Sequence, residues 1–154
     1  MAERTGSTAI IVVDTSRLEE VLKKLGDKAI PILRDSLNTI GITGESMVKE
    51  RTPVDTGRLR SSVSWKKSVF RPDEVRIGSN VVYAPFVIGD APPFFIYPRK
   101  RRALRFKIGN RVIFARRVRH PGGRRILQDV AAELQRDMPA IVDRIIDHHL
   151  KDVK

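Results

Sequence analysis

Two apolar stripes of helical period lie near opposite ends of this sequence, and they constrain its fold more than any other feature. The members of the first stripe, which runs to about residue 50, are Ile30, Leu33, Leu37, Ile40, Met47 and Val48. The members of the second are Ile126, Leu127, Val130, Leu134, Met138, Ile141 and Ile145. Apolar residues spaced three and four apart share one face of a helix, so both stretches predict long amphipathic helices.

The segments between the two stripes predict the surface that these helices cover. Short β-branched or alternating runs predict strands at residues 7–13, 63–69, 74–78 and 81–88, and a hairpin turning at Gly109-Asn110 within residues 103–118. The resulting order predicts an α+β fold, an antiparallel sheet of four to five strands with a long N-terminal helix and a long C-terminal helix packed on it. A length of 154 residues suits a single domain.

Local signals refine the helical part of this prediction. Ser16 followed by Glu19 forms a capping-box pattern, which predicts a first helical segment ending near Gly26. Gly41 and Gly44 interrupt the next stripe, where they predict a bend or close packing. That helix should end before Pro53, because the residue preceding a proline is pushed out of the α region.

Composition excludes several classes of protein. The sequence has no cysteine, so it forms no disulfide and no thiolate metal site, which suits assembly in a reducing cytoplasm. No apolar run approaches the roughly 20 residues of a membrane span, and the N-terminus has no secretory signal pattern. We expect no cofactor, no metal and no membrane partner.

The charge distribution predicts a partner. The formal net charge is +12, and residues 91–128 contain twelve Lys and Arg but no Asp or Glu. Such a window favours an acidic or polyanionic partner over a merely solvated face. The candidate contacts to DNA or to an acidic protein are Arg99, Lys100, Arg101, Arg102, Arg105, Arg116, Arg117 and Arg119.

Residues 89–103 predict an extended arm that prolines stiffen. Several prolines interrupt this segment, so it cannot form the interior of a sheet. Phe94, Phe95 and Tyr97 are its aromatic residues, and we expect them to anchor the arm on a partner.

The triplet Asp55-Thr56-Gly57 is also found around the catalytic carboxylate of aspartic proteases, but its context here predicts a turn. Those enzymes place two such loops after buried apolar strands, whereas this triplet follows a charged helical segment. Arg58 would also keep Asp55 ionised, while a proton-sharing pair needs one neutral carboxyl. We therefore expect Asp55 and Thr56 to accept hydrogen bonds from nearby backbone N–H groups.

The histidines predict no metal or catalytic site. His148 and His149 are adjacent and point to different sides of a helix, so they cannot chelate one metal as an i, i+4 pair can. His120 has no carboxylate near it in sequence. We expect no catalytic residue.

Two motif blocks resemble the neck and tail-completion proteins of long-tailed bacteriophages. The matching positions of the first block are Pro53, Asp55, Thr56, Gly57, Leu59 and Ser62, and those of the second are Gly78, Asn80, Tyr83 and Ala84. We interpret the first block as a structural turn and the second as a sheet motif in which Tyr83 is half-buried. The chain departs from the family at residues 87–90, where a glutamate, an aromatic and a glycine are common.

The resemblance implies a structural virion protein without enzymatic activity. It implies a ring of identical copies at the head–tail junction or the end of the tail, with six copies expected and twelve as the alternative. Its partners would be other neck, connector and tail-tube proteins, with DNA in the channel, after assembly in the host cytoplasm. The alternative hypothesis is a basic nucleic-acid-binding module that acts mainly through phosphate contacts.

Overall fold

The computed structural model describes residues 9–14, 26, 29–68, 71 and 74–151. Its elements in chain order are β1 (Ala9–Asp14), α2 (Ala29–Arg51), α3 (Arg58–Ser62), β2 (Ser64–Lys67), β3 (Glu74–Ser79), α4 (Ala84–Val87), β4 (Phe94–Ile96), β5 (Leu104–Ile108), β6 (Arg111–Ala115), β7 (Val118–His120) and α5 (Ile126–Lys151). Two long helices and several antiparallel strands confirm the predicted α+β class. The helical segment predicted from Ser16 lies outside the described residues.

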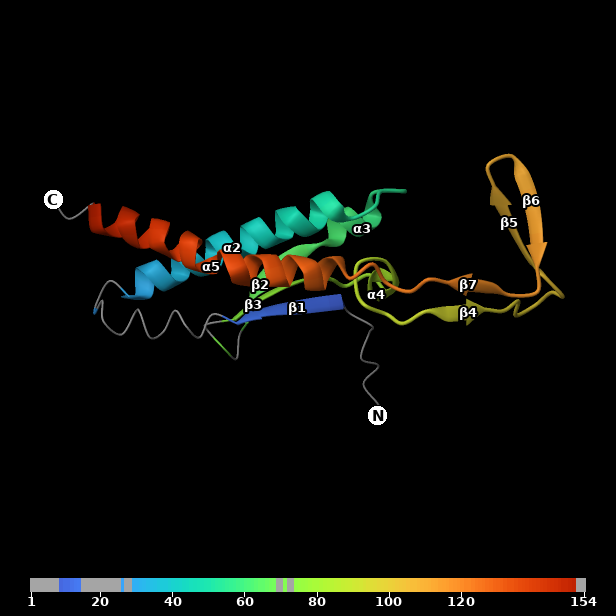
Figure 1. Cartoon of the computed structure of the whole chain (residues 1–154), viewed down its shortest axis with the longest axis horizontal. Coiled ribbons are helices and arrows are strands. Elements are labelled where there is room, and N and C mark those ends of the chain that lie inside the picture. Colours follow the sequence, from blue (N-terminus) through green and yellow to red (C-terminus); the bar gives the residue numbers. More distant parts are fainter. Residues whose placement is uncertain (1–8, 15–25, 27–28, 69–70, 72–73, 152–154) are drawn as a thin grey trace.

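The two long helices lie side by side and run antiparallel (Figure 1). At one end, Arg51 of α2 forms an ion pair of 2.6 Å with Glu133 of α5. At the other end, Asp35 of α2 lies 2.9 Å from Nε2 of His149, near the end of α5. Because each pair joins the start of one helix to the end of the other, the two contacts together require the antiparallel arrangement.

Both helices cover the same face of a small sheet, whose strand order is β1-β3-β2. On the covered face, Ile11 lies opposite Ile77, and both side chains are buried. The next residues along these strands, Val12 and Arg76, lie opposite each other on the other face and are exposed. This alternation follows from the period of two in a strand and places the hydrophobic core between the sheet and the helix pair.

The prediction of one sheet with four to five strands is wrong. The strands form three small sheets: β1-β3-β2, β4 with β7, and β5 with β6. Residues 81–88, predicted as a strand, form a turn followed by α4. The hydroxyl of Ser79 accepts a hydrogen bond from the backbone N–H of Val81 at 3.1 Å, and Pro85 lies in the first turn of α4. A proline has no N–H to give to a sheet and suits the first turn of a helix, so the chain turns here.

The glycines in α2 allow close packing, as predicted. A Cβ atom at Gly41 would lie 2.9 Å from Cε2 of Trp65, and a Cβ atom at Gly44 would lie 2.7 Å from Cδ1 of Leu134. Both positions are buried. These two glycines therefore let the backbone of α2 approach β2 and α5 more closely than any other residue would allow.

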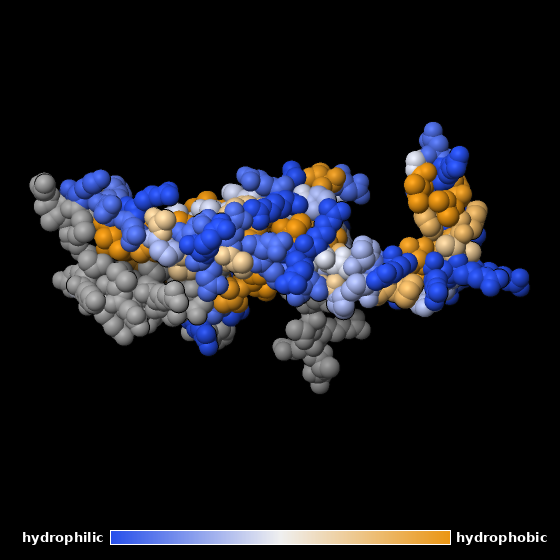
Figure 2. Space-filling model, viewed as in Figure 1, coloured by the Kyte–Doolittle hydropathy of each residue, from blue (hydrophilic) through white to orange (hydrophobic). Residues whose placement is uncertain are grey.

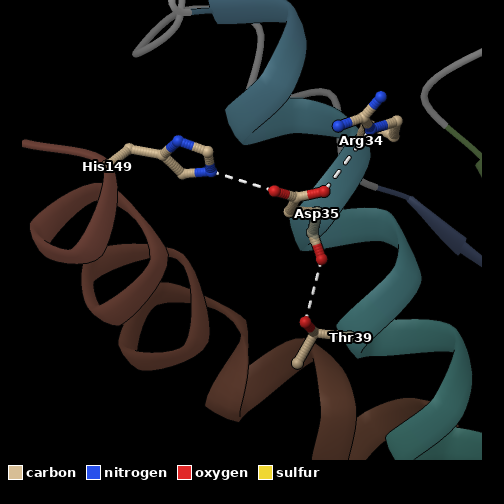
Figure 3. A network of polar contacts seen from close by, with 4 residues as sticks. All are labelled: Arg34, Asp35, Thr39 and His149. Atoms are coloured by element: carbon tan, nitrogen blue, oxygen red, sulfur yellow. Dashed lines mark hydrogen bonds and ion pairs between the residues drawn. The ribbon is translucent and has the colours of Figure 1, made fainter. Parts of the chain in front are cut away.

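A small polar network accompanies the contact between α2 and α5 (Figure 3). Asp35 faces His149 across the two helices, while Nε of Arg34 lies 3.4 Å from Oδ1 of the same carboxylate. The hydroxyl of Thr39 donates to the backbone carbonyl of Asp35 at 2.8 Å. The hydrogen bond with His149 lowers the pKa of Asp35 below its ordinary value of 3.8, and Arg34 adds to this effect.

The packing at Gly41 generates the first prediction. Gly41→Ala should lower the free energy of unfolding by about 1–3 kcal/mol, because the rigid Trp65 ring must move to admit a methyl group. This loss should exceed the gain of up to about 1 kcal/mol that alanine brings to a helix. Ser46→Ala, at an exposed position of the same helix, is the control and should not destabilise. Chemical denaturation of both variants tests this, and an unchanged stability of Gly41→Ala would contradict it.

The Asp35 network generates a pH-dependent prediction. Because the folded-state pKa of Asp35 is lowered, its ionised form stabilises the fold above pH 3.8, and this contribution is lost as the pH falls through the lower folded-state value. Asp35→Asn should therefore be less stable than the wild type at pH 6, by less than about 1 kcal/mol because the site is partly exposed. The difference should shrink below pH 3.8. Urea denaturation at pH 6 and pH 3 measures it, and a constant difference would contradict the prediction.

Candidate functional site: a projecting arm

The first motif block forms an exposed loop between α2 and α3. Pro53, Asp55 and Thr56 are exposed, and the side chain of Asp55 makes no hydrogen bond or ion pair with any residue that the structure describes. The hydroxyl of Thr56 accepts a long hydrogen bond of 3.5 Å from the N–H of Arg58. Gly57 has a φ of 79°, a left-handed conformation that favours glycine.

The expectation that Asp55 accepts a backbone hydrogen bond is therefore wrong. Gly57 occupies the cap position of α3 and has no side chain to cap it, and the N–H of Arg58 bonds to the hydroxyl of Thr56. Leu59 is the residue of the block that enters the core, where its side chain is buried. Gly57 and Leu59 thus stabilise the fold, while Pro53 and Asp55 are exposed.

A chain of hydroxyl hydrogen bonds joins the first motif block to the end of β3. Oγ of Ser62 lies 2.7 Å from Oγ of Ser79 and also 2.7 Å from the carbonyl oxygen of Leu59. A hydroxyl has a single proton, so Ser62 donates to Leu59 and accepts from Ser79. Ser79 in turn accepts from Val81. The two blocks, separated in sequence, are neighbours in the fold.

The second block is a sheet motif only in part. Gly78 lies in β3, where a Cβ atom would collide with the carbonyl of Ala9 on β1. Asn80 follows the strand and is exposed. Tyr83 precedes α4 in the turn described above, so its assignment to the sheet is wrong. Its side chain is 42% exposed. Ala84 begins α4 and is fully buried.

Residues 89–125, which we call the arm, project from the rest of the chain, which we call the body (Figure 1). Strands β4 and β7 form a ribbon that leads away from the body, and β5 and β6 form a hairpin at its far end. The extended arm predicted at residues 89–103 is the first half of this projection. None of the residues in the hydrophobic core, nor of the apolar residues packed against it, comes from the arm.

Backbone hydrogen bonds hold the root of the arm. The N–H groups of Gly123 and Arg125 donate to the carbonyls of Ala91 and Gly89, each at 2.8 Å. Gly122 has a φ of 94°, and a Cβ atom there would lie 2.5 Å from the carbonyl oxygen of Ala91. The two chain segments therefore leave the body in close contact, and glycine is needed where they touch.

The aromatic residues proposed as anchors lie on different faces of the ribbon. The ring of Phe94 stacks on His120 at 4.9 Å and meets Phe86 of α4 edge-on at 5.2 Å. Phe94 thus helps to fix the arm to the body. Phe95 is 45% exposed, and the guanidinium of Arg117 lies 4.9 Å from its ring centre.

Tyr97 extends the exposed aromatic surface. Its ring centre lies 6.4 Å from that of Phe95, and its side chain is 59% exposed. A cationic and aromatic surface is therefore exposed, formed by Phe95, Tyr97 and the guanidinium of Arg117. No other described residue covers it. The contacts of Phe94 with His120 and Phe86 depend on strand pairing and on α4, so the spacing of these residues in sequence did not reveal them.

The hairpin has two distinct faces. Two residues link β5 to β6 at Gly109-Asn110, as predicted, because Ile108 pairs with Arg111. On one face the paired residues are mainly apolar: Leu104 with Ala115 and Phe106 with Ile113. On the other face the pairs combine a cation with an apolar residue: Arg105 with Phe114 and Lys107 with Val112. Figure 2 shows apolar side chains gathered on this outer part of the arm.

The cations predicted to contact a partner are all exposed on the arm. They are Arg99, Lys100, Arg101, Arg102, Arg105, Arg116, Arg117 and Arg119. Of the ion pairs formed within the described chain, none involves an arm residue. The structure therefore brings cations and exposed apolar groups together on one projection, where no described carboxylate forms an ion pair with these cations.

The described residues contain no group of three His, Asp or Glu side chains arranged to hold a metal ion. Within the same residues, no helix combines the length and the apolar character that crossing a bilayer requires.

Comparison with known proteins finds a family match for part of the chain. Residues 16–88 match the HK97-gp10-like family, described as "Bacteriophage HK97-gp10, putative tail-component". The comparisons with curated proteins and with solved structures found no significant match. The family match confirms the resemblance over the segment that carries both motif blocks. The arm beyond residue 88 and α5 lie outside it.

The geometry of the first motif block generates a prediction. Asp55→Ala should change the free energy of unfolding by less than about 0.5 kcal/mol, because the side chain is exposed and bonds to no described residue. Leu59→Ala should cost about 2–5 kcal/mol, because Leu59 is buried in the core. Thermal and chemical unfolding of both variants test this difference. A loss above 1 kcal/mol for Asp55→Ala would indicate a capping role after all.

Proposed function

We propose, starting from the match of residues 16–88 to a phage tail-component family, that this protein is a structural subunit of the virion that assembles through its arm. In this proposal identical copies form a ring in the neck or at the top of the tail, and the arm of each copy reaches the body of the next. The protein has no catalytic role; it joins the DNA-filled head to the tail.

One observation carries the proposal. The arm exposes large apolar side chains on both sheets that it contains: Phe94, Phe95, Ile96 and Tyr97 on or beside β4, and Ile108, Val112, Ile113 and Phe114 in the hairpin. A two-stranded hairpin by itself is marginally stable in water. Contiguous exposed apolar surface on a monomer marks a site of interaction with another protein. The arm thus has the properties of an element completed by a neighbour.

The shape of the chain supports a ring. An arm that docks on a different surface of an identical neighbour makes a head-to-tail contact, which closes into a ring when the rotation between copies allows it. Six copies are the expectation from the family resemblance, and twelve are the alternative. Other neck, connector and tail-tube proteins would then bind the two faces of the ring.

A specific observation also favours the second function, binding of DNA within the channel. The arm carries twelve cations and the single carboxylate of Asp90, and Arg117 lies over the ring of Phe95. Neutralisation of phosphates by such a surface would make the affinity for DNA fall steeply with salt. A titration with duplex DNA between 50 and 300 mM NaCl measures this slope. If the protein stays monomeric and binds DNA with a steep dependence on salt, it is a nucleic-acid-binding module and not a ring-forming subunit.

Replacing the exposed aromatic pair tests the ring. Phe95→Ser combined with Tyr97→Ser should prevent assembly and leave the body folded, because neither side chain is part of the core. Size-exclusion chromatography with light scattering gives the oligomeric state, and thermal unfolding reports the fold. Unchanged assembly of this variant would contradict the proposed role of the arm.

A matched control uses the neighbouring aromatic residue. Phe94→Ser should disturb the contact with His120 and Phe86 at the root of the arm. We expect it to weaken assembly less than the double variant does, because the exposed surface of Phe95 and Tyr97 remains. Protease cleavage within residues 89–93 should increase in Phe94→Ser alone, which separates a loosened root from a lost interface.

A further inference from the structure

The arm holds almost the whole net charge of the chain. It contains twelve of the thirty Lys and Arg but only one of the eighteen Asp and Glu, so its net charge is +11 and that of all other residues together is +1. The body of a neighbouring copy therefore has no excess of negative charge with which to neutralise an arm. The cations of the arm indicate a second partner, in addition to a neighbouring copy.

These cations are most concentrated at one bend of the arm. The last pair of the ribbon is Ile96 with Val118, and the first pair of the hairpin is Leu104 with Ala115. The residues between these two pairs, 97–103 and 116–117, form what we call the elbow. Six of its nine residues are cations, and all six are exposed: Arg99, Lys100, Arg101, Arg102, Arg116 and Arg117.

The strand pairs hold the six cations of the elbow close together. Two residues, 116 and 117, join the strands on one side, so the paired residues that flank them have Cα atoms at most about 11 Å apart. Opposite residues in a strand pair lie about 5 Å apart, which limits the distance from Ile96 to Leu104 to about 22 Å. The chain between these two residues is about 30 Å long. It therefore bends, at residues 99–103, where the ribbon meets the hairpin (Figure 1).

No described carboxylate neutralises the elbow. Of the ion pairs formed within the described chain, none involves its six cations. Arg117 lies over the ring of Phe95, with 4.9 Å between the guanidinium and the ring centre, a contact that keeps its charge. Cations held this close repel one another, because charges act over about 8 Å at physiological salt. A partner with closely spaced negative charges removes this repulsion.

The hairpin beyond the elbow has a different composition. Of its twelve residues, 104–115, only Arg105, Lys107 and Arg111 are cations. Its large exposed apolar side chains are Ile108, Val112, Ile113 and Phe114. Figure 2 shows hydrophilic side chains at the far end of the ribbon and apolar ones on the hairpin. The outer part of the arm therefore has two separate surfaces, which suit partners of different chemistry.

Duplex DNA has the charge density that the elbow requires. A duplex presents one negative charge for about every 1.7 Å of its axis, whereas a folded protein surface usually mixes charges of both signs. Five of the six cations are arginines, and the planar guanidinium donates two parallel hydrogen bonds to a phosphate. The density and the type of these cations both favour a phosphate backbone over an acidic protein.

We infer that the elbow binds the phosphate backbone of duplex DNA, while the apolar hairpin contacts a neighbouring protein subunit. The inference rests on the DNA binding proposed above and assigns it to residues 97–103 and 116–117. Contacts to phosphates position a protein on a duplex without reading its sequence, so the binding is independent of base sequence.

The salt dependence of DNA binding tests this assignment. The elbow variant combines Arg99→Ser, Arg101→Ser and Arg102→Ser, and the matched hairpin variant combines Arg105→Ser, Lys107→Ser and Arg111→Ser. Both lose three charges from the same arm. Because the slope of log K against log salt is proportional to the number of phosphates neutralised, the elbow variant should keep about half of the wild-type slope and the hairpin variant nearly all of it. Fluorescence anisotropy of a labelled duplex of mixed sequence measures the slopes.

A third variant keeps the charge of the elbow. Arg99→Lys combined with Arg101→Lys and Arg102→Lys should retain the wild-type slope, because a lysine also neutralises a phosphate. Circular dichroism shows whether each variant is folded, and light scattering should give the elbow variant the oligomeric state of the wild type.

The outcomes separate this inference from the proposed ring. A wild type that assembles but does not bind duplex DNA at 50 mM NaCl would overturn the inference and leave the ring intact. If the elbow variant then also failed to assemble, the elbow would be a protein interface. If the wild type binds DNA and the folded hairpin variant loses as much of the slope as the elbow variant, DNA binding stands and its assignment to the elbow is overturned.

Discussion

The close contact between α2 and α5 is the constraint on which the rest of the structure depends. Gly41 and Gly44 let α2 approach the sheet and α5. The ion pair of Arg51 with Glu133 near one end and the hydrogen bond between Asp35 and His149 near the other hold the helices antiparallel. Because this contact orients α5, it also decides where residues 123–127 meet α4. The direction of the arm therefore follows from the packing of two helices to which the arm contributes no side chain.

The arm contributes no residue to the hydrophobic core, so other interactions must stabilise it. Its root is held by backbone hydrogen bonds and by the stack of Phe94 on His120, both close to the body. Beyond the root, its stability depends on two pairs of short strands with exposed apolar and cationic side chains. In the proposed assembly a neighbour would cover this element, and its order would then be coupled to assembly.

The motif blocks show how much of the site the sequence could predict. The turn at Gly57 followed from local chemistry and was confirmed. The burial of Leu59 was not predicted and is a property of the folded core. The role expected for Asp55 was wrong because Gly57 occupies the cap position of α3 and Thr56 accepts from the N–H of Arg58, so the carboxylate of Asp55 stays exposed. Tyr83 was misplaced because the competition between a strand and a helix at residues 81–88 was decided by the Ser79 hydroxyl and by Pro85.

The sequence by itself determined the α+β class, the two long helices, the hairpin turn at Gly109-Asn110 and the acid-free basic window, because each depends on local periodicity, turn chemistry or composition. Only the tertiary structure decided that the strands form three small sheets, that residues 89–125 leave the body, and that Phe94 packs on Phe86 and His120. These features depend on which strands pair and which faces are covered. Pairing between distant segments is a property of the whole chain, and no local pattern specifies it.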